Sequence, residues 1–324
     1  MLNFQNIYVE KKALNHERTK NILKHFEPAN IIEIDHYKDV FCRPKQNYIL
    51  QQKYQNLILA IKEEDFIYPG ASVCQDFGYE NFHYASCVMN CACNCEYCYL
   101  KGMYPSGYMV VFVNLEDYFE HIKDKKLYLC VSYDTDLFPL EKFLSYVKLW
   151  NEFAGQNPKI TIEIRTKFKN IEVWKMYPHN NVIFAFSLSP ESIINNFEHN
   201  TSSLDARIQN IKAAQSNGFK TRLCFDPIIY IKNWRKEYLQ MINKCFSEID
   251  SEKVLDISVG SFRISQSYLK NMRRLNSTSK IINFPFKNIN GYYQYEPKLQ
   301  NEMEQFVYKN ICKNFDSKKV FLWK

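Results

Sequence analysis

Glycine is scarce in this sequence, with only eight glycines among 324 residues. The chain contains neither G-x-G-x-x-G nor G-x-x-x-x-G-K-S/T, the loops whose backbone amides hold the phosphates of dinucleotides and of ATP. It also contains neither H-E-x-x-H nor G-x-S-x-G, which mark zinc proteases and serine hydrolases. These absences disfavour dinucleotide and ATP chemistry of the glycine-loop type, and both hydrolase classes.

The sequence also lacks any run of about 18 apolar residues, the length that crosses a bilayer. Its opening, MLNFQNIYVE, lacks the basic-plus-apolar pattern of a secretory signal peptide. We therefore expect a cytoplasmic protein without a membrane segment, in a reducing compartment where disulfides are rare. The content of 46% hydrophobic and 16% aromatic residues is typical of a globular protein, and the net charge of +7 is a mild indication of a polyanionic partner.

Three of the eleven cysteines have an informative spacing. Cys91, Cys95 and Cys98 form C-x3-C-x2-C, with Tyr97 before the third cysteine and Tyr99 after it. Three thiolates so placed can hold three corners of a 4Fe–4S cluster. The fourth iron would then lack a protein ligand and could bind a substrate or cofactor, so the motif predicts chemistry.

Zinc is the alternative for this loop. Structural zinc takes four ligands, usually from two C-x-x-C-like pairs, and no distant second pair exists here. Cys87 or Cys93 could nevertheless complete a zinc site. The sequence favours the cluster and leaves the roles of these two extra thiols open.

The middle of the chain alternates between apolar strand patterns and amphipathic helix patterns. The expected strands are residues 82–87, 108–113, 127–132, 160–165, 182–187, 221–225 and 255–260, and the expected helices are residues 116–125, 141–153, 203–216 and 235–246. Such alternation predicts a parallel sheet with helical crossovers. We expect an α/β fold with a partial (β/α)6 barrel, whose active residues lie at the carboxyl ends of the strands.

The two ends of the chain have different patterns. Residues 1–80 form a mixed α/β lead-in, with a helix expected over residues 9–26 and a strand over residues 57–61. Residues 81–280 form the expected barrel. Residues 281–324 form a hairpin around Asn290-Gly291 and a helix over residues 298–313.

C-x3-C-x2-C at the start of a partial barrel is the signature of the radical S-adenosylmethionine superfamily, and here the likeness extends further. From about Ile7 to its end, the chain resembles the spore photoproduct lyase family of DNA repair enzymes. The segments that carry the likeness are IYVEKKAL, CNCEYCYL, VFVNLED, RTKF, FSLSPESIINNFEHNTSSLDARI and DPIIY followed by Trp234. The FE-x-x-TS stretch is specific to this family.

The resemblance implies a function and two cofactors. Family members use a 4Fe–4S cluster and S-adenosylmethionine to make a 5′-deoxyadenosyl radical, which takes hydrogen from the methylene carbon of a thymine–thymine adduct formed by ultraviolet light. The linking bond then breaks, and the remaining thymine radical receives a hydrogen atom. Expected partners are UV-damaged double-stranded DNA and a one-electron reductant of flavodoxin or ferredoxin type, in the spore core of a spore-forming bacterium.

The resemblance also implies residue roles. Cys91, Cys95 and Cys98 would hold the cluster. Cofactor contacts are expected from Tyr97, Thr135, Lys167 and Ser187, with Lys167 matching a family lysine that contacts the cofactor carboxylate. Tyr97 and Tyr99 are also candidates for relaying hydrogen, although both could simply pack around the cluster.

The chain departs from the family at its third strand. The family has a cysteine there, followed by Thr-Ser-Asp, which returns hydrogen to the thymine radical. Here the alignment that keeps Thr135-Asp136 in register places Tyr133 at the donor position. A phenol can donate hydrogen, so we predict that Tyr133 is the donor and keep Cys74, Cys87 and Cys130 as alternatives.

A second departure lies in the C-terminal hairpin that family members use to pry the lesion from the DNA stack. Here residues 287–295 are short, with Lys287 as the only cation and with tyrosines at 292, 293 and 295 that could stack on bases. Lys270, Arg273 and Arg274 form a nearby basic cluster suited to phosphates. Two other functions therefore stay open: a radical enzyme of this lineage with another substrate, and a non-catalytic cluster or zinc protein that binds nucleic acid.

Overall fold

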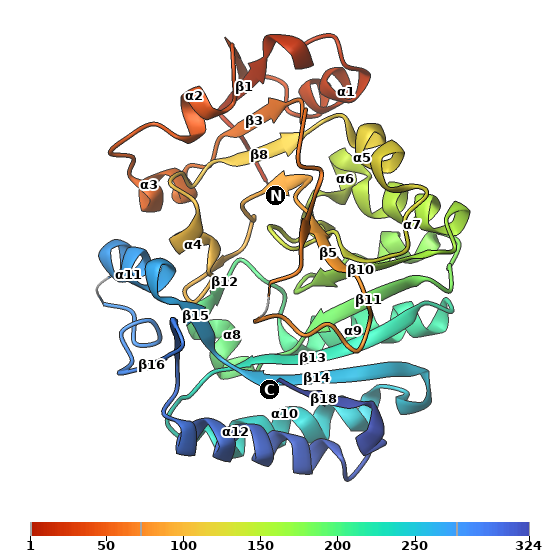
Figure 1. Ribbon diagram of the computed structural model, residues 1–324, viewed down its shortest axis with the longest axis vertical. Helices are drawn as coiled ribbons and strands as arrows, with labels where there is room; N and C mark the ends of the chain where they lie inside the picture. The colour runs from red at the N-terminus through yellow and green to blue at the C-terminus, as the bar shows by residue number, and fades with distance from the viewer. Residues whose placement is uncertain (1, 72, 277, 324) are drawn as a thin grey trace.

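Two β-sheets organise the chain, as the computed structural model shows for residues 2–71, 73–276 and 278–323 (Figure 1). The larger sheet contains, in spatial order, β18 (Val320–Leu322), β14 (Val254–Ser261), β13 (Lys220–Ile228), β11 (Val182–Ser187), β10 (Ile160–Thr166), β9 (Leu127–Cys130), β5 (Phe82–Ala85) and β4 (Ile67–Pro69). From β5 to β18 every neighbouring pair is parallel, and β4 is antiparallel to β5. Strands β9 and β11 are buried along their whole length, as expected for parallel strands covered on both faces.

The crossovers between these strands are helical. They contain α5 (Leu115–Ile122), α6 (Glu141–Leu144), α7 (Tyr146–Gln156), α8 (Glu191–Phe197), α9 (Leu204–Ser216) and α10 (Trp234–Glu248). The expected helix over residues 141–153 is interrupted at Ser145, whose φ of 56° is left-handed. The expected start of α9 is confirmed, because the Ser203 side chain accepts a hydrogen bond from the amide of Ala206.

Six of the strands, β5, β9, β10, β11, β13 and β14, correspond to the expected barrel units. The order of the sheet runs from β18 to β4 without joining its two edges among the described residues, so the barrel is open. The prediction of a partial (β/α)6 barrel is therefore confirmed. One assignment within it was wrong: the strand expected at residues 108–113 is β8 (Met109–Phe112), and β8 belongs to the other sheet.

The smaller sheet lies at the top of Figure 1. Its order is β2 (Asn30–Ile34), β1 (Asn6–Glu10), β3 (Leu57–Ala60), β8 and β6 (Val88–Met89). The expected helix over residues 9–26 was only half right, since β1 extends to Glu10 and α1 (Glu17–His25) begins later. Two short helices, α2 (Lys38–Phe41) and α3 (Tyr48–Lys53), precede β3.

Strand pairing between β3 and β8 joins residues on both sides of position 80. The division into a lead-in, a barrel and a C-terminal part stays a prediction. All four residues of β8 are buried, and so are all four residues of β3, with which β8 pairs in parallel. Burial of the apolar side chains of both strands therefore favours this pairing.

The C-terminal part adds a small sheet and covers one end of the large one. Strands β15 (Arg263–Ser265), β17 (Tyr292–Gln294) and β16 (Lys287–Ile289) form the expected hairpin and its neighbour. Asn290 and Gly291 both have positive φ, 51° and 86°, as a two-residue type I′ turn requires. Helix α11 (Gln266–Leu275) lies beside α4 (Leu100–Met103), and α12 (Pro297–Ile311) runs below β14 and β18 (Figure 1). In the described part of the chain, no helix has the length and apolar character that crossing a bilayer requires.

Candidate active site

The cysteine loop follows β5, the first barrel strand, as the sequence predicts. Within it, β7 (Asn94–Cys95) pairs antiparallel with β12 (Glu198–His199), so that Cys95 lies opposite Glu198. The amide of Glu96 also donates to the carbonyl of Phe197 at 2.8 Å. A segment about a hundred residues further along the chain therefore fixes the backbone of the loop.

The thiols of this loop are buried, and a positively charged side chain lies near them. Burial raises the pKa of Cys95 to about 12 and that of Cys98 to about 11, while the nearby Lys167 acts to lower both. Among the described residues, no group of three or more His, Cys, Asp or Glu side chains is arranged to hold one metal ion. Since each corner of a cubane is a separate iron, the three cysteines need not converge on one point.

Lys167 lies at the end of β10 and reaches the cysteine loop. Its ammonium donates to the Tyr97 hydroxyl at 2.7 Å and to Glu198 Oε1 at 2.8 Å. The Tyr97 hydroxyl donates to the same carboxylate oxygen. Burial raises the pKa of Tyr97, which keeps the phenol protonated. The structure thus brings together two residues that the sequence assigned to the cofactor.

Glu198 is the centre of this network, and sequence reasoning did not single it out. Its side chain is fully buried, and it accepts hydrogen bonds from Ser189 Oγ at 2.7 Å and from Arg207 Nη2 at 2.5 Å. Burial opposes ionisation of Glu198, but Lys167 and Arg207 outweigh it and lower its pKa well below the usual range. The available signal was the FE-x-x-TS stretch, whose glutamate is Glu198.

Arg207 extends the network to Ser187. This arginine is 1% exposed and donates to the carbonyls of Ser187 and Ser202 and to the Thr201 hydroxyl, at 3.0, 2.9 and 2.8 Å. Ser187 is therefore at the end of β11, as expected, and is held beside Glu198 through its backbone.

Thr135 has a polar atom without a partner. Its Oγ1 is buried and makes no hydrogen bond to any described residue. Buried hydroxyls are ordinarily paired, because an unpaired one loses its hydration without replacement. The neighbouring Asp136 binds the amide of Lys167 at 2.7 Å, which places Thr135 next to the lysine end of the site. An unpaired hydroxyl at this position fits a bound cofactor.

Tyr133, the expected hydrogen donor, lies against a cysteine. Its hydroxyl is 3.6 Å from the Sγ of Cys74, and its ring stacks on Tyr84 with the centroids 4.1 Å apart. The Tyr99 hydroxyl donates to the backbone carbonyl of Tyr133 at 2.5 Å. The Cys74 thiol and the Tyr133 hydroxyl, which can each carry a hydrogen atom, are thus in contact, and the ring of Tyr99 lies next to that of Tyr133 with the centroids 5.7 Å apart.

The other two candidate thiols are directed elsewhere. Cys87 is completely buried and its Sγ lies 3.8 Å from the carbonyl of Val131. Cys130 faces Glu163, with 3.9 Å between Sγ and Oε1. Arg263 holds the loop of Cys74, because its Nε donates to the carbonyl of Val73 at 2.9 Å. This arginine was also missed from the sequence.

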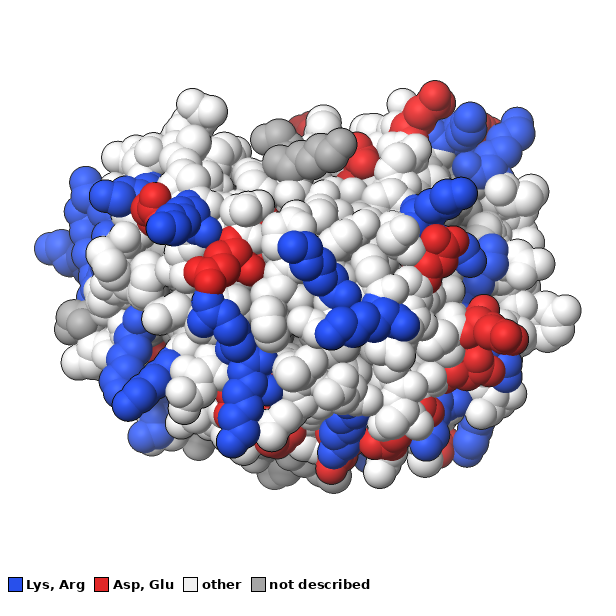
Figure 2. Space-filling model, turned by 90° about the horizontal axis from the view of Figure 1, so that it is seen from below, with Lys and Arg blue, Asp and Glu red and all other residues white. Residues whose placement is uncertain are grey.

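The segment that contains β15, α11 and the hairpin carries charge of one sign. Residues 257–295 contain six Lys or Arg residues and no Asp or Glu. Lys270, Arg274, Lys280 and Lys287 are exposed. By contrast, the face over α10 and α12 carries positive and negative side chains interspersed (Figure 2).

Two expectations for this region need correction. Arg273 is not free for phosphates, because its guanidinium donates to the carbonyls of Ile282 and Phe284, both at 2.9 Å. Tyr295 cannot stack on a base, because it is 1% exposed and its hydroxyl accepts from the amide of Tyr230. Tyr292 and Tyr293 are half-buried, and Tyr293 lies against Arg273.

The same region contacts the cysteine loop and the helix after it. Ser279 Oγ donates to Glu96 at 2.6 Å, and the Asn271 amide donates to the carbonyl of Gly102 at 2.9 Å. Gly102 permits this contact, since a Cβ there would lie 2.4 Å from the carbonyl oxygen of Tyr268. Helices α4 and α11 therefore approach backbone to backbone.

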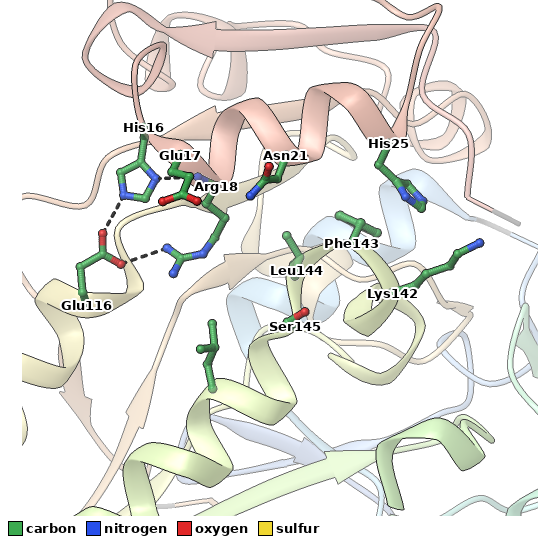
Figure 3. A pocket seen from close by; sticks show the side chains of 11 residues that line it. His16, Glu17, Arg18, Asn21, His25, Glu116, Lys142, Phe143, Leu144 and Ser145 are labelled. Atoms are coloured by element: carbon green, nitrogen blue, oxygen red, sulfur yellow. Dashed lines mark hydrogen bonds and ion pairs between the residues drawn. The ribbon is translucent and has the colours of Figure 1, made fainter. Parts of the chain in front are cut away.

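A hollow of about 700 Å³ lies outside this site, between α1 and the start of α7 (Figure 3). His16 and Arg18 point toward Glu116 there, at 2.6 and 3.0 Å. None of the expected cysteines, tyrosines or cofactor residues lines it. The hollow is therefore separate from the expected chemistry.

Comparison with known proteins decides the family. The family model described as spore photoproduct lyase matches residues 2–322. This chain belongs to the spore photoproduct lyase family. The resemblance that the sequence indicated is therefore confirmed over nearly the whole chain.

Curated spore photoproduct lyases match most of the chain. The chain is 27% identical over 330 residues to spore photoproduct lyase of Clostridium acetobutylicum, covering 95% of each protein. It is 24% identical over 272 residues to that of Bacillus subtilis, covering 78% of this chain and 76% of the relative.

Solved structures of spore photoproduct lyase share the fold. One in complex with dinucleoside spore photoproduct has a TM-score of 0.84 at 18% identity, covering 99% of this chain and 98% of the other. A variant with bound AdoMet and dinucleoside spore photoproduct has a TM-score of 0.82, also at 18% identity and with the same coverage. At these identities the likeness concerns the architecture.

Proposed function

We propose that this protein repairs spore photoproduct, returning the cross-linked thymine pair in DNA to two thymines with a radical derived from S-adenosylmethionine. The family match over residues 2–322 carries the proposal. The site supports it, because the cysteine loop, Lys167 and Thr135 lie close together at the carboxyl end of the barrel strands. The relatives' names supply the substrate, and the geometry supplies a site that fits the chemistry.

The residues fit a cluster and its cofactor. Cys91, Cys95 and Cys98 hold the 4Fe–4S cluster, which with bound S-adenosylmethionine supplies a 5′-deoxyadenosyl radical. The unpaired hydroxyl of Thr135 and the ammonium of Lys167 bind the polar end of S-adenosylmethionine. Ser187 contributes at the end of the next strand. Tyr97 orients the ammonium, since its hydroxyl accepts from Lys167.

Hydrogen return runs first through Cys74, one of the alternative donors, and then through Tyr133, which the sequence predicted as the direct donor. After the adduct loses a hydrogen atom and its linking bond breaks, the thymine radical takes the hydrogen atom of the Cys74 thiol and leaves a thiyl radical. The Tyr133 hydroxyl, 3.6 Å from that sulfur, gives its hydrogen atom to the thiyl and becomes the tyrosyl radical, which one electron from the reductant and one proton return to the phenol. Burial raises the pKa of both groups, so each carries the hydrogen that it must give. Tyr99, which directly follows Cys98, contacts Tyr133 through a hydrogen bond to its backbone carbonyl.

The partner is UV-damaged double-stranded DNA. The exposed cations of residues 257–295, without any carboxylate among them, favour contacts with DNA phosphates. Lys287 belongs to the same hairpin as Tyr292, whose half-buried side chain suits contact with an extruded base. A flavodoxin or ferredoxin type of protein delivers the electron, and repair takes place in the cytoplasm of the spore.

The test combines anaerobically reconstituted protein, dithionite, S-adenosylmethionine and two substrates, dinucleoside spore photoproduct and a duplex carrying the same adduct. We expect conversion of the adduct to two separate thymine residues in both substrates, and loss of the reaction in C95A. Formation of 5′-deoxyadenosine without conversion of the adduct would overturn the substrate assignment and favour a relative with another substrate. Absence of any 5′-deoxyadenosine with an intact cluster would overturn the radical chemistry itself.

A further inference from the structure

Lys101 is a buried lysine that the proposed reaction does not use. It lies on α4, three residues after Cys98, and is 8% exposed. Its ammonium donates to the side-chain oxygen of Asn94 at 2.6 Å. Asn94 itself belongs to β7, which the pairing with His199 holds in place. The amide oxygen is neutral, so this contact orients the ammonium without balancing its charge.

The charge of Lys101 has no carboxylate partner within 4.0 Å among the described residues. Glu96, an acidic residue of the cysteine loop, is engaged elsewhere, with Ser279 at 2.6 Å and His199 at 3.4 Å. Lys167 is different, because Glu198 lies 2.8 Å from its ammonium. A buried ammonium without a counter-charge is costly, so its surroundings should contain a negative group.

The cysteine loop holds Lys101 at both ends of its residue. The ammonium is bound to Asn94, the residue before Cys95, and the Lys101 amide donates to the carbonyl of Cys98 at 3.2 Å. Burial lowers the pKa of Lys101, whereas Cys98, Cys95 and then Glu96 act to raise it. The ammonium therefore lies beside two of the three proposed cluster ligands.

We propose that Lys101 is the counter-charge of the cluster and raises its reduction potential. The inference rests on the cluster proposed above. Three thiolates around a 4Fe–4S core leave a net negative charge, and the added electron makes that charge larger. A fixed positive charge therefore stabilises the reduced state more than the oxidised state. Lys101 tunes the cluster through electrostatics and is a positioning residue, because it touches neither substrate nor cofactor.

The consequence concerns which reductants can start the reaction. A flavodoxin or ferredoxin sets the solution potential at which the cluster is reduced. At that potential, a cluster with a higher reduction potential is reduced in a larger fraction of the protein molecules. Removing the charge should lower the ratio of reduced to oxidised cluster about ten-fold at a fixed poise, which corresponds to about 59 mV for one electron.

The experiment is an anaerobic redox titration followed by electron paramagnetic resonance of the reduced cluster. Wild type is compared with K101M and K101Q, which remove the charge, with K101R, which keeps it, and with K123M as a control. Lys123 is half-exposed and pairs with Glu120 on the surface, so neutralising it should leave the potential unchanged. We expect K101M and K101Q to shift to lower potential by a similar amount, and K101R to stay near wild type.

Iron and sulfide contents of each variant separate the outcomes. K101M or K101Q with a full cluster and the wild-type potential would overturn the inference. Failure of both neutral variants to assemble a cluster that K101R does assemble would also overturn it, in favour of a structural role. A wild-type protein without any signal from a reduced cluster would instead contradict the proposed function.

Discussion

Replacing Glu198 with glutamine should destabilise the cluster-free protein strongly. Glu198 is fully buried and faces two cations, Lys167 at 2.8 Å and Arg207 at 2.5 Å, and Arg207 is itself 1% exposed. Glutamine keeps the size of the side chain but removes the negative charge, which leaves both cations without a counter-charge. Breaking a buried ion pair from one side costs about 3–5 kcal/mol. That is a large part of a typical free energy of unfolding of about 5–15 kcal/mol.

The assay is urea unfolding of the cluster-free, reduced protein at pH 7, followed by circular dichroism. E172Q is the matched control, because Glu172 pairs with Lys175 on the surface, where both side chains are mostly exposed. Such a pair contributes about 0–1 kcal/mol. An unfolding free energy of E198Q within about 1 kcal/mol of wild type would refute the view that this carboxylate holds the site together.

The pH dependence gives the same prediction a second check. The pKa of Glu198 is lower in the folded protein than in the unfolded chain. Its ionised form therefore stabilises the fold above the unfolded value of about 4.5, and this stabilisation is lost as the pH falls from that value toward the lower folded pKa. The difference between wild type and E198Q should accordingly be full at pH 7 and shrink below about pH 4.

Four further predictions concern other parts of the molecule. In the repair assay, C74A and Y133F should each slow conversion of the adduct to two thymine residues and divert the thymine radical to side products, whereas C87A should not. Unchanged rates and products in both variants would remove the pair from the reaction. Burial raises the pKa of Glu141 to about 7, although its carboxylate accepts hydrogen bonds from the amides of Val147 and Lys148. Ionisation of Glu141 should therefore lower the unfolding free energy of the wild type by roughly 3 kcal/mol as the pH rises from about 4.5 to 7. The unfolding free energy of E141Q, measured in urea, should lack this pH dependence. G102A should lower the unfolding free energy by about 1–3 kcal/mol, because the new Cβ meets backbone of Tyr268 that cannot move aside; a stabilised G102A would mean that α4 and α11 are not in contact. Removal of iron with a chelator should abolish 5′-deoxyadenosine formation and leave the far-ultraviolet circular dichroism unchanged, since β7 and β12 are held by hydrogen bonds of the protein itself.

The parts of the site that depend on local spacing could be predicted from the sequence. Cys91, Cys95 and Cys98 lie within eight residues, so their spacing alone limits what they can hold. Lys167 and Ser187 each end an apolar strand, and parallel strands bring their carboxyl ends to one edge. The order of the strands was therefore enough to predict that Lys167 and Ser187 lie at the same edge of the sheet.

The parts that depend on distant contacts could not be predicted. Glu198 looked like one acidic residue in a polar stretch, and its role follows from a pairing with Cys95 across about a hundred residues. Strand β8 has the same buried apolar pattern as the barrel strands, so periodicity could not tell which sheet it joins. Tyr133 and Cys74 come from separate loops, and only the fold shows that their side chains touch.

The pairing of β7 with β12 also has a consequence for biosynthesis. At roughly 5–20 residues per second, a ribosome takes roughly 5–20 s to proceed from Cys95 to Glu198. During that interval the thiols of the nascent chain have left the ribosome before the strand that will hold their loop has been made. Oxidants and adventitious zinc thus meet the cysteines before folding shields them, and iron delivery is best timed to follow completion of β12.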